Sequence, residues 1–349
     1  MKNSPNDKSF IALPSLSSWS LSPQSLSPSL LLYREITGMK QILIRLLLTI
    51  PVLWLVVSLV FLLIHLVPGD PIQTMLGDGA TAADITALRH QYHLDLPLPL
   101  QYLDYWKGVL HGDLGESIRL HDSVTHLIAQ RYPYTLALTL CALVVGLLLA
   151  LPAGIAAAVR RGRLTDQALS VVSLFGLSVP GLALGPVLIL VFSILLGWLP
   201  VSGANSGGTK AIDWHYLVLP AIAMGASLAA ILTRMVRTAM LEELGQDYIR
   251  TARAKGLAES AVVWRHALPN ALVPIVTVVG LQFGALLAGA IVTEKIFSWP
   301  GLGRLVVDAI SNRDYALVQG CLLSIGLTYV LVNLLTDVVY RWINPRMRA

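Results

Sequence analysis

The polar residues with the most regular spacing in this chain lie in one segment, residues 242–269, between two long apolar stretches. The segment reads EELGQDYIRTARAKGLAESAVVWRHALP, is charged and has a helical pattern. It is broken once, at Gly256, and is expected to be stopped by Leu268-Pro269. A polar helix–turn–helix segment inside an apolar chain is typical of a docking surface for a soluble partner. The chemistry that it indicates is binding.

Catalytic motifs offer no competing interpretation. No lysine completes a G-x-x-x-x-G-K-[ST] loop, so any ATP that drives this chain is hydrolysed on a partner. The 8 histidines are scattered, and no H-E-x-x-H occurs. Cys141 and Cys321 fall in apolar stretches, which predicts packing rather than a disulfide or a metal site. No basic run is interleaved with aromatic residues, so no nucleic-acid partner is expected.

Composition identifies the environment that must position this segment. Hydrophobic residues make up 55% of the chain and charged residues 13%, and the mean hydropathy is +0.68. The bilayer explains so much apolar sequence better than a soluble core does. A hydrocarbon core of ~30 Å needs about 20 apolar residues in each helix. Six stretches predict membrane spans: residues 43–67, 133–159, 167–198, 216–238, 271–294 and 315–339.

Basic residues near the span ends predict the orientation. They lie before the first span, in alternate intervals and after the last span: Lys40, Arg45, Arg160, Arg161, Arg163, Arg234, Arg237, Arg250, Arg253, Lys255, Arg265, Arg341, Arg346 and Arg348. The positive-inside rule places these intervals and both termini in the cytoplasm. The acid-rich interval 68–132 then lies on the opposite side of the membrane. It predicts a helix near 81–93 and carries an aromatic patch.

Local spacing predicts how the polar segment is built. Apolar positions at Met240, Leu244, Tyr248 and Ala252 recur every four residues and predict one face of a helix. Gly256 is suited to the left-handed conformation that ends a helix. A second helix is expected over 258–267, with Pro269 starting the re-entry into the membrane. The alternative is an amphipathic helix that lies on anionic lipid.

Two further places in the spans attract attention. The third span contains Ser178 and Pro180, and the proline predicts a kink or break that is either a hinge of the pathway or a tolerated distortion. Glu294 closes the fifth span. It is either a substrate or gate contact, since ionisable groups at membrane depth are usually functional, or an interfacial residue paired with Lys295 or Arg304.

Residues 1–38 are of a different kind. They are rich in Ser, Pro and Leu, and this composition predicts a disordered leader. They lack the pattern of a signal peptide. Met39 and Lys40 begin a typical membrane-protein sequence, so Met39 is a candidate for the true initiator.

The polar segment resembles a known family. YIRTARAKGL (248–257) followed by HALPNAL (266–272) is similar to the coupling-loop signature of bacterial ABC importer permeases of the peptide/nickel type. Ala252, Gly256, Leu268 and Pro269 match the general pattern at the right spacing. Arg250, Thr251 and His266 depart from it in the manner of the peptide/nickel branch. Either Asp247 or Glu243 would supply the acidic contact that the departure removes.

Further motifs extend the resemblance over residues 39–349. They are HLVPGDP (65–71), HGDLGES (111–117), EKIFSWPGLGRL (294–305), RDYALVQG (313–320) and NPRMR (344–348). The resemblance implies an all-α integral membrane protein with six transmembrane helices, of the type I ABC importer permease kind, with both termini inside. Its periplasmic region would be 68–132 and its cytoplasmic coupling loop 239–270. The periplasmic region would be either a scoop that receives a binding protein or a lid on the bundle.

The resemblance also implies partners and a site. The chain would form half of a pathway for dipeptides or oligopeptides across the bacterial inner membrane, with nickel or glutathione as alternative cargo. Partners would be a second homologous permease, two ABC ATPase subunits that hold ATP and Mg, a periplasmic substrate-binding protein and membrane lipid; no cofactor is expected on this chain. The implied coupling residues are Glu243, Asp247, Tyr248, Arg250, Thr251, Ala252, Arg253, Ala254, Lys255, Gly256, Leu257, His266, Leu268 and Pro269.

One function from another class competes with this interpretation. An ion-coupled secondary transporter would act alone, and such proteins usually need an acidic residue near the middle of the bilayer. The central parts of all six predicted spans lack Asp, Glu, Lys and Arg. The sequence therefore favours a permease that is driven by a partner.

Overall fold

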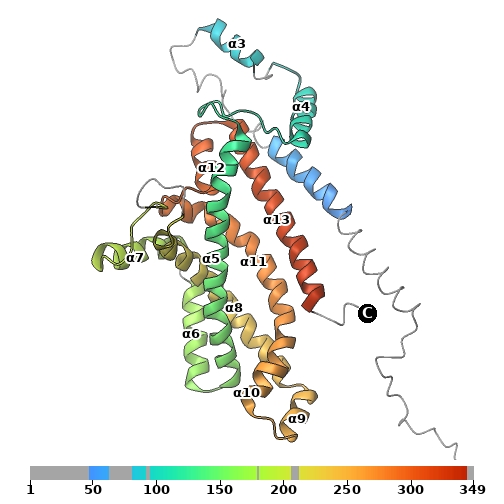
Figure 1. Ribbon diagram of the computed structural model, residues 1–349, viewed down its shortest axis with the longest axis vertical. Coiled ribbons are helices and arrows are strands. Elements are labelled where there is room, and N and C mark those ends of the chain that lie inside the picture. Colours follow the sequence, from blue (N-terminus) through green and yellow to red (C-terminus); the bar gives the residue numbers. More distant parts are fainter. Residues whose placement is uncertain (1–46, 63–80, 92–94, 179–180, 206–211, 344–349) are drawn as a thin grey trace, which may run out of the picture.

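A computed structural model describes residues 47–62, 81–91, 95–178, 181–205 and 212–343, and these are mainly helical (Figure 1). The predicted leader 1–38, the motifs at 65–71 and 344–348, and Pro180 lie outside the described residues. An apolar helix, Leu47–Leu62, comes first. It is followed by α3 (Ala82–Gln91), α4 (Leu98–His111), α5 (Val124–Val159), α6 (Leu164–Ser178), α7 (Gly181–Leu188), the π-helix η2 (Ile189–Leu195), α8 (Trp214–Leu244), α9 (Asp247–Ala254), α10 (Glu259–Ala261), the π-helix η3 (Val262–Ala267), α11 (Leu268–Ile296), α12 (Leu302–Ser311) and α13 (Tyr315–Ile343).

Long helices form a bundle with two distinct ends. In Figure 1, α9 and α10 lie at one end, hereafter the α9 end, while α12 and α4 lie at the other, the α12 end. Among the described residues, four helical runs are long and apolar enough to cross a membrane: α5, α8, the continuous run Glu259–Ile296, and Tyr315–Thr336 of α13. A bent pair, Leu164–Ser178 with Ala183–Leu195, would make a fifth. The first predicted span, 43–67, stays a prediction, because the described helix Leu47–Leu62 is shorter than a span requires.

Two predicted spans differ in detail from the structure. The second begins at Val124 and not at residue 133, because the Ser123 side chain caps the helix by accepting from the His126 backbone N–H. The third is two helices whose axes differ by 108°. Helix α6 ends at Ser178 and α7 starts at Gly181. This agrees with the break predicted next to Pro180.

The most extensive packing in the bundle joins α5 to α8. Glycines on each helix remove the side chain where the other helix approaches. A Cβ on Gly146 would lie 2.6 Å from Leu228, and one on Gly154 would lie 2.6 Å from Val236. A Cβ on Gly225 would lie 2.8 Å from the Ala142 carbonyl oxygen. Small residues let membrane helices approach closely. Dispersion contacts between the two helices then stabilise the pair.

Glycines also allow α13 to approach its neighbouring helices closely. A Cβ on Gly280 or Gly284 of α11 would lie 2.2 Å from Thr336 or Tyr329, respectively. On α13 itself, a Cβ on Gly326 would lie 2.9 Å from Val56 of the first helix. The first helix, α13 and α11 are thus joined in series through glycine contacts.

Helix α4 packs on the first helix near Phe61. The Tyr102 ring packs edge-on against Phe61 with centroids 5.3 Å apart, and its hydroxyl lies 2.7 Å from the Ser58 hydroxyl. The Tyr105 Oη and Trp106 Nε1 atoms are buried and have no hydrogen-bond partner among the described residues. Contact with one helix does not separate a scoop from a lid, and both interpretations of the region 68–132 stay predictions.

Two of the sequence motifs meet at the α12 end. The Asp314 side chain is buried, accepts a hydrogen bond from the Ser117 hydroxyl at 2.5 Å, and accepts from the Leu317 backbone N–H at 3.2 Å. One carboxylate therefore caps α13 and holds the loop that precedes α5. This explains why Asp and Ser occur in the motifs at 313–320 and 111–117.

An ion pair fastens α6 to α8 near the α9 end. The Arg237 guanidinium donates to both oxygens of Asp166, at 2.6 Å and 2.9 Å, and the Gly162 backbone N–H donates to the same carboxylate at 2.9 Å. The side chain of Asp166 is 7% exposed and that of Arg237 is 30% exposed. Such a bidentate contact fixes the relative position of the two side chains and also stabilises the pair.

Removing one member of this pair should destabilise the bundle. Arg237→Ala leaves the Asp166 carboxylate buried without its cation, and the expected loss is roughly 3 kcal/mol of unfolding free energy. Thermal unfolding of the detergent-solubilised protein, followed by tryptophan fluorescence, measures it. The matched control is Asp166→Leu with Arg237→Met, which removes both charges and should recover most of the loss. Equal instability of the single and double variants would contradict this account.

Candidate functional site

The polar segment folds into an elbow, defined here as residues 245–267, between α8 and α11. Its buried residues pack as one cluster with the bundle: Ile249, Ala252, Val262, Val263 and Ala267 of the elbow against Ile155, Ala158, Val236, Ala239, Met240, Ala271 and Ile275. The cluster therefore joins the elbow to α5, α8 and α11 together. A displacement of the elbow would be transmitted to three helices at once, since packed interiors deform little.

The predicted single helical face across residues 240–252 is wrong. Helix α8 ends at Leu244, and Gly245 and Gln246 turn the chain before α9 begins at Asp247. The turn rotates the pattern, so Ile249 is fully buried and Tyr248 is 40% exposed. The apolar periodicity of the sequence continues through Gly245, but the helix does not.

Hydrogen bonds tie the first helix of the elbow to the helices on both sides. The Tyr248 hydroxyl donates to the Glu243 carboxylate at 2.5 Å, and the Asn270 amide donates to the Tyr248 oxygen at 3.0 Å. The same amide donates to the His266 carbonyl oxygen at 3.2 Å. Glu243 is therefore engaged within the chain, whereas the side chain of Asp247 is 94% exposed and contacts Arg250 at 3.2 Å.

Gly256 makes the sharp turn of the elbow. Its φ is +79°, the left-handed region predicted for it, and a Cβ there would meet nothing within 4 Å. Across the turn, the Arg253 guanidinium donates to both oxygens of Glu259, at 2.6 Å and 3.0 Å. The carboxylate raises the pKa of the Arg253 side chain above its usual value, first through this hydrogen bond. The turn is thus held by backbone conformation and by an exposed ion pair.

The outward face of the elbow holds most of the predicted coupling residues. These exposed residues are Asp247, Tyr248, Arg250, Thr251, Arg253, Ala254, Lys255, Gly256 and Leu257. Trp264 of η3, which the sequence analysis did not single out, is 58% exposed. A tryptophan next to Arg265 in a polar segment is a signal that was present in the sequence. Ala252 and Leu268 belong to the packed inner side and His266 is half-buried.

Pro269 does not stop a helix. The run Glu259–Ile296 is continuous, with Pro269 in the first turn of α11. The preceding residues are π-helical, and the Leu268 backbone N–H donates to the Val263 carbonyl five residues back. A proline without an N–H fits in such a widened turn, which is why the predicted boundary is absent.

Glu294 lies in a buried polar cluster at the α12 end. Its side chain is fully buried, and its carboxylate accepts from the Thr135 hydroxyl at 2.6 Å and from the Arg304 backbone N–H at 2.9 Å. A Cβ on Gly301 would lie 2.1 Å from this carboxylate. The predicted ion pair with Lys295 or Arg304 is wrong, because Lys295 instead contacts Asp308 at 2.8 Å. The carboxylate caps α12, and a pathway role for Glu294 stays a prediction.

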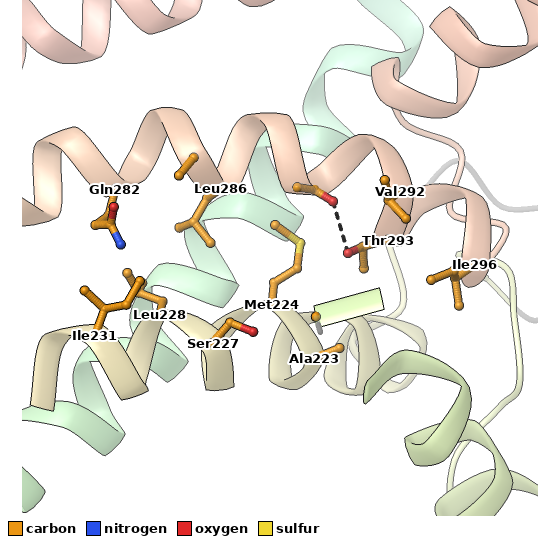
Figure 2. Close-up of a pocket in the computed structure, with 13 residues that line it drawn as sticks. Ala223, Met224, Ser227, Leu228, Ile231, Gln282, Leu286, Val292, Thr293 and Ile296 are labelled. Atoms are coloured by element: carbon orange, nitrogen blue, oxygen red, sulfur yellow. Dashed lines mark hydrogen bonds between the residues drawn. The ribbon is translucent and has the colours of Figure 1, made fainter. Parts of the chain in front are cut away.

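A groove runs between α8 and α11. Its volume is about 340 Å³, and Figure 2 shows residues of the two helices facing one another across it. The lining residues are Gly181, Ala223, Met224, Ser227, Leu228, Ile231, Gln282, Ala285, Leu286, Gly289, Val292, Thr293 and Ile296. Neither Ser178 nor Glu294 is among them. Ser178 is exposed at the end of α6, where its hydroxyl donates to the Leu174 carbonyl at 2.9 Å.

A bundle of long apolar helices with a packed elbow and a groove between two of them defines a multi-pass membrane protein. Residues 150–349 match the family described as binding-protein-dependent transport system inner membrane component, and residues 39–139 match the N-terminal family of such membrane components. The chain belongs to this family. It is an inner-membrane permease of the ABC importers, of the peptide/nickel type, and the resemblance found in its motifs is confirmed.

Individual relatives agree with the family. The chain is 45% identical over 304 residues to the glutathione transport system permease protein GsiC of Salmonella choleraesuis (strain SC-B67), covering 87% of this chain and 97% of that one. The protein of that name from Escherichia coli (strain K12) gives the same figures. A chain of the MetNI methionine ABC transporter in an inward-facing crystal structure matches with a TM-score of 0.50 and 21% identity. It covers 62% of this chain and 96% of that chain, and this likeness concerns the fold.

The conformation of Gly256 gives a test of the turn. Gly256→Val puts a β-branched side chain at φ +79°, and the strain of ~1–2 kcal/mol should raise amide hydrogen exchange in residues 247–261 about tenfold. Gly256→Asn is the matched control, because asparagine tolerates the left-handed region, and its exchange should stay near that of the unchanged protein. Exchange rates that do not distinguish Val from Asn would show that the turn is not under this constraint.

The contribution of the polar cluster around Glu294 to stability can be tested by substitution. Glu294→Ala leaves the Thr135 hydroxyl and the buried N–H groups of α12 without an acceptor, so the unfolding free energy should fall by about 3 kcal/mol. Thermal unfolding in detergent measures the change. The control is Lys295→Ala, whose ion pair with Asp308 is about half exposed and should leave the unfolding temperature unchanged. Similar losses in the two variants would refute the assignment.

Proposed function

We propose that this permease forms half of an ATP-driven pathway that carries small peptides, with glutathione among the candidate cargoes, into the cell. The observation that carries the proposal is the elbow, which exposes a charged face and buries a core shared with α5, α8 and α11. Family membership as an ABC importer permease supports the general activity. The 45% identity to a glutathione transport permease supports the peptide class.

The proposed assembly contains a second homologous permease, two ABC ATPase subunits that bind ATP and Mg, and a periplasmic binding protein. The chain has no phosphate-binding loop of its own, so the energy for transport would enter at a contact with the ATPases. Their contact would be the outward face of the elbow, with Arg250, Lys255 and Leu257 at its centre. The binding protein would deliver substrate at the α12 end.

The proposed topology has six spans with both termini in the cytoplasm. Basic residues at the α9 end support it: Arg160, Arg161 and Arg163 lie between α5 and α6 or at their ends, and Lys255 and Arg265 lie in the elbow. The first span would extend Leu47–Leu62 at both ends. The α9 end would therefore face the cytoplasm and the α12 end the periplasm.

The proposed mechanism depends on contacts between the ATPases and the elbow that differ between the ATP-bound and nucleotide-free states. ATPases that close on ATP would hold the elbow in a position that differs from the nucleotide-free one, and this favours one arrangement of the helices. The hydrogen bonds of Tyr248 to Glu243 and Asn270 would keep the elbow from moving independently of α8 and α11. The bundle would then alternate between states open to the cytoplasm and to the periplasm.

Charge reversal on the elbow tests the proposal. Arg250→Glu with Leu257→Glu changes two exposed residues, so the fold should be kept while ATPase copurification and ATP-dependent uptake of glutathione and tri-alanine fall at least about tenfold, a coupling loss of ~1.4 kcal/mol. Affinity purification of the tagged chain in mild detergent, with mass spectrometry and uptake in proteoliposomes, measures both.

The control is Arg163→Glu, an exposed charge at the same end outside the elbow, which should keep both activities. Recovery of the unchanged chain alone, with transport retained without ATP, would overturn the proposal and favour a secondary transporter. Full ATPase recovery by the elbow variant would remove the docking role.

A further inference from the structure

The groove between α8 and α11 is elongated along the two helices. Its lining on α11 extends from Gln282 to Ile296, fourteen residue steps, which at 1.5 Å per residue is about 21 Å. Figure 2 shows Gln282 facing Ile231 at one end, while Ile296 and Ala223 lie toward the other. The groove therefore follows the two helices lengthwise. A ligand in it would lie extended along the direction in which the helices cross the membrane.

The groove is open because small residues form part of its lining. A Cβ built on Gly289 would meet no atom within 4 Å, and one on Gly181 would lie 3.4 Å from the Ser227 hydroxyl oxygen. Other glycines of α11, such as Gly280 and Gly284, are instead filled by side chains of α13. Gly289 thus does not serve helix packing within the described residues, and its missing side chain leaves room for a ligand.

Three uncharged polar side chains face this otherwise apolar space. Within the part of the chain that the structure describes, the Ser227 hydroxyl and the Gln282 amide have no hydrogen-bond partner. The Thr293 hydroxyl donates to the Gly289 carbonyl oxygen at 3.2 Å and keeps its lone pairs for a further donor. Polar groups in apolar surroundings are costly when unpaired, so these groups are suited to a ligand that supplies partners.

We infer that this groove is a substrate subsite that holds the backbone of a small peptide in an extended conformation. The inference rests on the proposed function, in which a second permease closes the open side. The Gln282 amide can donate to a peptide carbonyl and accept from a peptide N–H, and the two hydroxyls pair with further peptide groups. Met224, Leu228 and Leu286 contact side chains without selecting among them. The volume is within the usual range of about 300–1,000 Å³ for ligand pockets.

Filling the groove tests this directly. Gly289→Leu places a side chain in empty space and should leave assembly with the partner permease and ATPases unchanged. Uptake of glutathione and tri-alanine per ATP hydrolysed should fall at least about tenfold, because the leucine occupies the volume of the ligand. The assay uses the purified complex in proteoliposomes with its binding protein. Leu281→Trp, which adds bulk at a 59% exposed position of the same helix outside the groove, should transport normally.

A second variant probes the hydrogen bonds. Gln282→Leu keeps the size of the side chain and removes the amide, so uptake of both probes should slow about threefold to tenfold, the effect of one lost hydrogen bond. Binding-protein-stimulated ATP hydrolysis should be retained, because the elbow is untouched. A merely structural role for Gln282 would instead lower assembly and hydrolysis together.

The outcomes separate the inference from the proposed function. If the unchanged complex shows no ATP-dependent uptake of either probe, the peptide function falls and the inference falls with it. If the unchanged complex transports and Gly289→Leu transports equally well, the groove holds no substrate. If Gly289→Leu prevents the two permeases from assembling, the groove receives a helix of the partner, and the inference is likewise overturned.

Discussion

The close contact of α5 with α8 is the constraint on which the other features depend. Gly146, Gly154 and Gly225 let the two backbones approach over residues 142–154 of α5 and 225–236 of α8, and the same contact bears on both candidate sites. Toward the α9 end, Ile155 and Val236 continue it into the core of the elbow. In the middle, Leu228 packs against Gly146 and also lines the groove. The α8 wall of the groove therefore has a fixed support behind it.

The elbow and the groove occupy different stretches of the same two helices. Helix α8 contributes Ser227 to the groove and Met240 to the core below the elbow, and α11 contributes Gln282 and Ile275 in the same way. A rigid displacement at the elbow would thus change the spacing of the groove walls without any relay through side-chain rearrangement. Glu294 and Asp314 hold the far ends of α11 and α13 in place, as the Arg237–Asp166 ion pair holds α6 to α8 near the α9 end.

The sequence predicted what depends on local chemistry. Apolar length located the four long spans and the bent pair, the glycine at 256 located the turn, and the motif spacing located the family. It failed where tertiary contacts decide. The stripe ending in Tyr248 was displaced by the turn at Gly245, and Pro269 entered a continuous helix because η3 widens the backbone ahead of it. The partners of Glu294 are Thr135, far away in the sequence, and backbone N–H groups that no pattern of side chains reveals. The groove was missed for a related reason: Gly280, Gly284 and Gly289 look alike in sequence, and only the fold shows which one is unfilled.

The surroundings of Glu294 restrict how this part of the chain can evolve. A side chain on Gly301 would overlap the carboxylate, and one on Gly303 would overlap both the carboxylate and Ile291. The carboxylate accepts from the backbone of residue 304, whose side chain is free to vary without loss of that bond. A side chain at 301 would displace the acid at 294, whereas one at 303 would also clash with the Ile291 backbone, which loss of the acid would not relieve. Glycine is therefore required at 303 by two neighbours at once.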